Sequence, residues 1–174
     1  MISSIVITLI GPDRSGLVEE IARTVASGGG NWLESRLSHL GGQFAGMVQI
    51  EVAEDKVAEL KSALEGLASH GLEVVVCDAT TADMEDCDQV ALVEIVGHDR
   101  SGIVSQISSA FAAFKVNVER LDTERKSAPM TGEALFEAKA RVCIPSEVDL
   151  GNLSDKLEEI ASDLMVDVTV EVEK

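Results

Sequence analysis

The sequence predicts an α+β protein made of two homologous modules, each with the element order βαββαβ. Three observations lead to this fold class. A motif occurs twice, hydrophobic residues alternate in short segments, and between those segments they recur at helical spacing. The motif is GPDRSGLV from Gly11 and GHDRSGIV from Gly97, an offset of 86 positions. The chain is therefore expected to hold two modules rather than one domain.

The elements of each module follow from hydrophobic periodicity and from glycine signals. In the first module we expect a strand at 5–10, a helix from 17, strands at 32–40 and 44–52, a helix from 57 and a strand at 72–77. In the second we expect strands at 90–96, from 117 and at 136–144, and helices from 103 and 150. Strands that alternate this cleanly are buried on one side only, so both helices should cover one face of an antiparallel four-stranded sheet. This arrangement is ferredoxin-like.

The module boundary is expected near Glu85, which gives modules 1–84 and 85–174. The segment from Asp78 to Asp88 is rich in acidic residues that face no basic residue, which is typical of a solvated linker. Beyond the second strand, the offset between the copies grows from 86 to 92 positions. The added residues fall at 127–132, where Pro and Gly predict a lengthened hairpin loop.

Composition and charge argue against several classes of partner. The formal net charge is −17, so a phosphate backbone or an anionic membrane surface would be repelled. Only 3% of residues are aromatic and none is tyrosine, so the stacking residues of RNA-recognition domains, which share this topology, are missing. The N-terminus has no basic leader and no cleavage site. We therefore expect a cytoplasmic protein without direct nucleic-acid or membrane binding.

The cysteines and histidines do not predict a metal site or a disulfide framework. Cys77, Cys87 and Cys143 are odd in number and form no C-x-x-C pair, so we expect reduced thiols, with Cys143 a small core or interface residue. Three histidines lack neighbours at ligand spacing, so neither a metal nor another cofactor is expected: His39, His70 and His98. Basic residues cluster on neighbouring strands and predict a solvated face or a surface for an acidic partner: Arg120, Arg125, Lys126 and Arg141.

The repeated loop from Gly11 to Gly16 is the candidate ligand site. A strand that ends in such a loop and opens a helix presents backbone N–H groups at the positive end of the helix dipole. This end suits a carboxylate, while Asp13 suits an ammonium group, so that an amino acid would be held at both ends. The alternative is that Asp13 or Ser15 only caps the helix and that the glycines only serve the turn.

The motif, together with Asn31 or Asn117 after the helix, resembles the ACT domain, a small-molecule regulatory module. More narrowly, NWLESRL from Asn31 and LGGQF from Leu40 resemble the glycine cleavage system transcriptional repressor family. The resemblance implies amino-acid binding near the first strand-to-helix loop, at an interface between modules. The candidate ligand-binding residues it implies are Asp13, Arg14, Ser15, Gly16, Leu17, Asn31, Asp99, Arg100, Ser101, Gly102, Ile103 and Asn117.

The function expected from these observations is regulation without catalysis. The sequence shows no nucleophile–base pair and no paired metal ligands, and the repeated loop lacks the lysine of a phosphate-binding loop. Every expected helix is used within the two modules, so none remains for a helix-turn-helix. The resemblance implies a sensor of a small amino acid, glycine favoured, that controls a separate DNA-binding activator by protein contact. The alternative is a regulatory amino-acid-binding subunit of a metabolic enzyme. We also expect self-association, because open sheet edges are usually covered.

Overall fold

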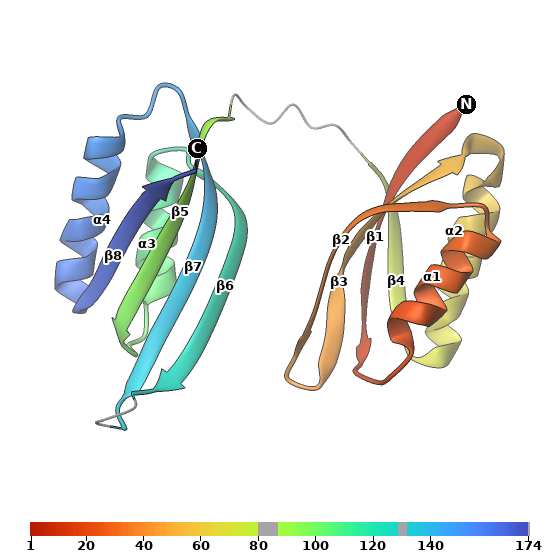
Figure 1. Cartoon of the computed structure of the whole chain (residues 1–174), viewed down its shortest axis with the longest axis horizontal. Coiled ribbons are helices and arrows are strands. Elements are labelled where there is room, and N and C mark those ends of the chain that lie inside the picture. Colours follow the sequence, from red (N-terminus) through yellow and green to blue (C-terminus); the bar gives the residue numbers. More distant parts are fainter. Residues whose placement is uncertain (80–86, 129–131, 174) are drawn as a thin grey trace. The chain divides into compact units, whose positions relative to one another are not determined.

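The computed structural model describes residues 1–79, 87–128 and 132–173, and the chain divides into two compact units (Figure 1). The units are Met1–Thr81 and Ala82–Lys174, and we call them module one and module two. The boundary predicted near Glu85 lies outside the described residues and stays a prediction. Both ends of the expected linker, by contrast, belong to strands. Asp78 is the last residue of one strand, and Asp88 is the second residue of the next.

Module one has the predicted order, with two short 3-10 helices added around its second α-helix. Its elements are β1 (Ile2–Pro12), α1 (Leu17–Ser27), β2 (Asn31–Leu40), β3 (Gln43–Ala53), η1 (Glu54–Lys56), α2 (Val57–Glu65), η2 (Gly66–His70) and β4 (Glu73–Asp78). The strands form an antiparallel sheet in the order β2-β3-β1-β4. Gly41 and Gly42, with φ of 58° and 80°, make the tight turn between β2 and β3 that the sequence predicts.

The core of module one lies between its sheet and its two helices. Alternate residues of β1, such as Ile5 and Ile7, are fully buried and meet Ile21 of α1 and Leu60 of α2. No helix in the described part of module one covers the opposite face of the sheet, and there Met47 stays half exposed. One-sided burial is therefore what produces the alternating pattern in the sequence.

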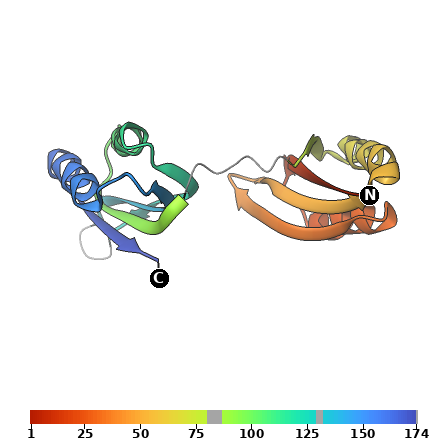
Figure 2. The same ribbon diagram turned by 90° about the horizontal axis from the view of Figure 1, so that it is seen from above.

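Module two repeats this architecture. Its elements are β5 (Cys87–His98), α3 (Ile103–Ala113), β6 (Asn117–Ser127), β7 (Ala134–Pro145), α4 (Leu150–Leu164) and β8 (Val166–Val172). The sheet order β6-β7-β5-β8 matches that of module one, and α3 and α4 cover one face of it (Figure 2). The fold class predicted from the sequence, two ferredoxin-like modules, is confirmed. The predicted loop at 127–132 falls between β6 and β7, although residues 129–131 lie outside the described part.

The two cores differ where α3 crosses the edge of the second sheet. Module two has a cavity of about 20 Å³ there, lined by apolar side chains that include Val118 and Ala140. The repeat aligns these two residues with Trp32 and Val48 of module one, where both side chains pack in or against the core. The smaller side chains of module two account for the space.

Candidate functional site

The first repeated loop connects the end of β1 to the start of α1. The backbone N–H of Asp13 donates to the carbonyl of Gly42 at 2.9 Å, which fixes the loop to the β2–β3 turn. Helix α1 begins after Gly16, whose φ is 86°, and no side chain caps its N-terminus. The alternative in which Asp13 or Ser15 caps this helix is therefore wrong. A left-handed glycine lets the chain enter the helix instead.

The second loop has the same construction. The N–H of Asp99 donates to the carbonyl of Ala134 at 3.0 Å, and α3 begins after Gly102, whose φ is 95°. Again no side chain caps the helix. The N–H groups of a first helical turn have no partner within the helix, and they carry the positive end of its dipole. Both loops therefore present an uncapped helix end, the feature that suits a carboxylate.

Gly11 and Gly97 differ in role from the glycines that start the helices. A Cβ atom at Gly11 would lie 2.5 Å from the carbonyl oxygen of Gly71, and one at Gly97 would lie 2.6 Å from the Cα of Val166. No side chain fits at such distances, so these two glycines allow the neighbouring chain to approach closely. At Gly16, in contrast, a Cβ atom would have no neighbour within 4 Å, so the backbone conformation is what requires glycine there.

Each loop aspartate lies beside a basic side chain from the second strand of its module. The Asp99 carboxylate contacts the Arg125 guanidinium at 2.7 Å, and Asp13 lies 3.7 Å from the His39 ring. His39 and Arg125 are 86 positions apart, the same offset as the motif. Sequence reasoning did not single out His39 and Arg125 as neighbours of the loop aspartates, although their offset of 86 positions is a signal that they hold equivalent places in the two modules. A ligand ammonium at either aspartate would therefore share the carboxylate with a basic group already there.

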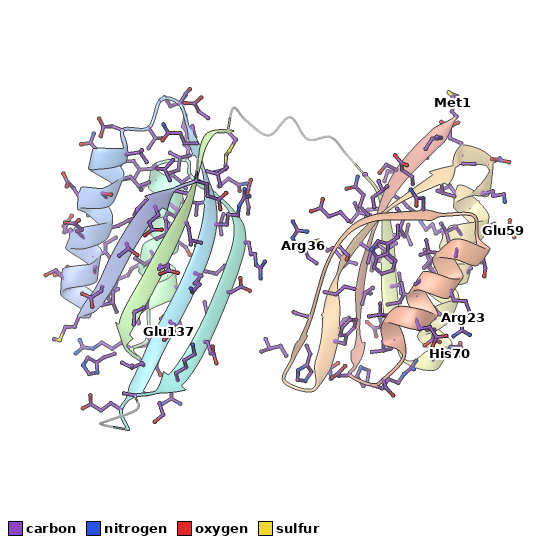
Figure 3. The ribbon with its side chains drawn as sticks, in the orientation of Figure 1. Met1, Arg23, Arg36, Glu59, His70 and Glu137 are labelled. Carbon is purple, nitrogen blue, oxygen red and sulfur yellow. A yellow bond between two sulfur atoms is a disulfide. The ribbon has the colours of Figure 1, made fainter. Side chains whose placement is uncertain are left out.

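The two loop arginines have different surroundings. Arg14 forms an ion pair with Glu20 at 2.5 Å, and Glu20 also contacts His70. Hydrogen bonds from His70 and Arg14 hold the pKa of the Glu20 carboxyl below its ordinary value. His70 itself is labelled beside α1 in Figure 3. The charge of Arg14 is thus already balanced within module one.

In module two the position that matches Glu20 is Gln106, so that carboxylate is missing. Among the described residues, the contact found for the Arg100 guanidinium is the sulfur of Met165 at 3.3 Å, and no ion pair is found. A thioether is a weak acceptor. The Arg100 guanidinium is therefore available to pair with an incoming anion, whereas the Arg14 guanidinium is already paired with Glu20.

The side chains of the remaining loop candidates are either buried or make no capping contact. Leu17 and Ile103 are only 3% and 2% exposed, because each is the first helical residue and points into its core. Ser15 and Ser101 are exposed, and neither makes a cap. These four positions lie in or beside the loops as predicted, and their part in ligand binding stays a prediction.

Asn31 and Asn117 lie far from the loops of their own modules. Asn31 starts β2 opposite Glu51, which pairs with Ser4 at the beginning of β1, whereas the loop follows the end of β1 at Pro12. The rise of a strand places these two ends roughly 27 Å apart. Asn117 holds the equivalent position at the start of β6. Within a module, the structure does not bring these asparagines to the candidate site.

A hollow of about 300 Å³ lies next to the second loop, lined by Arg125, Lys126, Ser127, Gly132 and Ala134. Hydrogen bonds to Glu137 and Glu124 raise the pKa of the Lys126 ammonium above its ordinary value. The basic residues of this sheet are all ion-paired. Besides Arg125 and Lys126, Arg120 contacts Asp122, and Arg141 contacts Glu119 and Glu173. These basic residues thus form ion pairs rather than an unpaired basic patch.

The cysteines differ from the expectation. Cys87 and Cys143 form a disulfide, and Cys77 is free and exposed. Cys143 is buried on the open face of the sheet, not in the core between sheet and helices. The two cysteines are 56 residues apart in the sequence, and only the pairing of β5 with β7 brings them together. The sequence alone therefore does not predict the disulfide. Among the described residues, one group of three potential metal ligands occurs, and it contains both cysteines with Glu119. The bonded sulfurs are not available to a metal in this state.

No helix in the described part of the chain is long and apolar enough to cross a membrane.

Comparison with known proteins decides the nature of module one. The ACT domain family model matches residues 3–76, nearly all of that module. The strand order of module two, β6-β7-β5-β8, matches the order β2-β3-β1-β4 of module one. Module one thus carries an ACT domain, and module two has the same fold.

Several known proteins match the chain over almost its whole length. The glycine cleavage system transcriptional repressor of Escherichia coli is 23% identical over 169 residues, which cover 97% of this chain and 89% of that protein. The crystal structure of an unknown protein from Galdieria sulphuraria is 26% identical, with a TM-score of 0.89 and all of both chains covered. The structure of a proposed glycine cleavage system transcriptional repressor superposes with a TM-score of 0.72 at 19% identity, covering 100% of this chain and 99% of that one, and shares the fold. The chain thus resembles this repressor family over nearly its whole length, which supports a regulatory protein.

Proposed function

We propose that this protein is a regulator without catalytic activity that senses a small amino acid, glycine favoured, and controls a separate DNA-binding transcriptional activator by protein contact. The observation that carries the proposal is the duplicated, uncapped helix end behind Gly16 and Gly102. The regulatory output rests on the resemblance to glycine cleavage system transcriptional repressors.

The ligand carboxylate is expected at the N–H groups of the first helical turn, and its ammonium group at Asp13 or Asp99. The second loop is the stronger candidate. Arg100 has no carboxylate partner in the described part of the chain, whereas Arg14 is already paired with Glu20. Glycine has five non-hydrogen atoms, and the ceiling of about −1.5 kcal/mol per atom limits its affinity to roughly micromolar. Such weak binding suits a sensor of a metabolite pool.

The output passes through another protein, because the chain itself is poorly suited to DNA. Its net charge of −17 repels a phosphate backbone. All four α-helices of the described residues pack on the two sheets, so none of them is a free recognition helix. The asparagines at the far ends of the sheets contribute to a ligand site only if they come from another module or another copy, which is consistent with a homo-oligomer.

The test is calorimetric titration of the full chain with glycine and the other amino acids, using four single variants. Asp99→Ala and Arg100→Ala should each weaken binding by about 10-fold or more, because a charge-assisted contact contributes roughly 1.5–3 kcal/mol. Asp13→Ala tests the first loop in the same way. Arg14→Ala is the matched control for Arg100, and it should change affinity little because Arg14 is held by Glu20.

If none of these variants changes the binding of an amino acid that the wild type binds, the loops are not the site. The partner is tested separately, by whether the amino acid changes the amount of a purified transcriptional activator that co-sediments with the chain. Ligand binding without any such partner, together with ligand-dependent binding to a metabolic enzyme, would favour the enzyme-subunit alternative.

A further inference from the structure

Module two contains a covalent link that the proposed function does not use. Cys87, the first residue of β5, is bonded to Cys143 of β7, and the yellow bond in Figure 3 marks it near the start of β5. The two Cα atoms are 5.5 Å apart, within the usual range for a disulfide. The pair joins the start of β5 to the end of β7, the strand with which β5 pairs.

The strand ladder places the two sulfurs side by side. From Gln89 onward β5 pairs regularly with β7, and Val90 lies opposite Cys143. Between Cys87 and Gln89 the register shifts by one residue. Because side chains alternate between faces, this irregularity turns Cys87 to the open face on which Cys143 lies. Backbone pairing holds the two residues close before any covalent bond forms.

The surroundings of the pair allow the bond to open without disturbing the core. Both sulfurs lie on the open face, and neither cysteine belongs to the cluster of core residues between the sheet and α3 or α4. Cys143 is 3% exposed, whereas Cys87 is only half buried. A carboxylate oxygen of Glu119 lies within 4.8 Å of both sulfurs, and Arg141 pairs with that carboxylate. A soluble thiol therefore has access to Cys87 but not to Cys143.

We propose that Cys87 and Cys143 form a reversible thiol–disulfide site that exchanges with low-molecular-weight thiols and disulfides of the glutathione class. In the oxidising direction, the Cys87 thiolate attacks glutathione disulfide, forms a mixed disulfide and releases one glutathione thiolate. The Cys143 thiolate then attacks the Cys87 sulfur, forms the protein disulfide and releases the second glutathione. Two thiol protons pass to the two released glutathione molecules, and one disulfide is consumed for each one formed.

Opening or closing the disulfide changes how firmly the start of β5 is held. In the oxidised form Cys87 is anchored covalently to β7, across a sequence separation of 56 residues. In the reduced form the first residues of β5 are held only by the irregular end of the ladder, so this end opens more readily. The reduced form also agrees with the thiols expected in a reducing compartment.

The test uses the full chain with Cys77→Ser, which removes the exposed free thiol, in the presence of a chelator. The native protein is reduced with dithiothreitol, transferred to glutathione buffers of varied ratio, and its free thiols are then counted by alkylation and mass spectrometry. We expect two alkylated thiols after reduction and none with excess glutathione disulfide, with two glutathione molecules released per chain. In the same background, Cys143→Ser should trap a single glutathione on Cys87.

The melting temperature of module two should also fall by roughly 8 °C or more on reduction, while circular dichroism at 25 °C stays unchanged. Three results would overturn the proposal. The first is that both thiols stay alkylatable in excess glutathione disulfide. The second is that two glutathione molecules attach to the chain without forming the protein disulfide. The third is that reduction in native buffer either fails or unfolds the module. The last result would make the bond a permanent structural one.

Discussion

At the residue scale, the start of each loop helix depends on glycine rather than on a capping side chain. Gly16 and Gly102 have positive φ, and the aspartate and serine before each of them make no cap. The motif places the loop correctly along the chain. It does not predict that the cap is missing, because Asp and Ser before a helix are common caps and only the structure shows that they make no capping hydrogen bond here.

The requirement for glycine at position 16 gives a prediction. Gly16→Ala should lower the free energy of unfolding of module one by about 1–2 kcal/mol, because alanine resists the left-handed conformation. A steric contribution is not expected, since nothing lies within 4 Å of a Cβ at this position. Urea denaturation of the full chain, followed by a signal from Trp32 in module one, measures the change.

Gly66→Ala is the matched control, since Gly66 also has open space around its Cβ position but has a helical φ of −61°. It should leave stability unchanged or raise it by about 0.4–1 kcal/mol, because alanine restricts the unfolded chain. Equal effects at both glycines would show that the conformation at Gly16 is not the cause.

At the element scale, the sequence predicts nearly all of each module. Alternation gives the strands because each sheet is buried on one side, and the pair Gly41 and Gly42 gives the turn. What the sequence does not predict depends on register between distant strands. The bond between Cys87 and Cys143 needs both the pairing of β5 with β7 and its irregular end. The position of Asn31, at the opposite end of the sheet from the loop, likewise follows only from the strand order.

The cavity beneath α3 provides a prediction at this scale. Ala140→Val should raise the free energy of unfolding of module two by about 0.5–2 kcal/mol, because Ala140 lines the cavity and the added methyl groups fill part of it. Its counterpart in module one, Val48→Ala, removes the same atoms from a fully buried position and should destabilise that module. Thermal unfolding of both variants measures the two changes, and a lower melting temperature for Ala140→Val would mean that α3 is displaced rather than supported.

At the scale of the whole molecule, duplication has produced two modules with the same fold and unequal loops. Module one neutralises Arg14 with Glu20 and fills its core with Trp32. Module two leaves Arg100 without a carboxylate in the described part of the chain, and it carries the disulfide. Because the two cores are separate clusters, each module has its own stabilising interactions. A substitution in one core should therefore leave the core of the other module intact.

The charge of the whole chain leads to the last prediction. With 31 acidic and 14 basic residues, the protein should form no complex with duplex DNA, even at low salt where attraction to phosphate would be strongest. The basic side chains of the module two sheet do not change this, because Arg120, Lys126 and Arg141 are each paired with carboxylates. A mobility-shift assay with purified protein, with and without glycine, measures this directly. A sharp shifted band that competitor DNA of unrelated sequence fails to remove would show that the chain reads DNA itself and would contradict control through a separate activator.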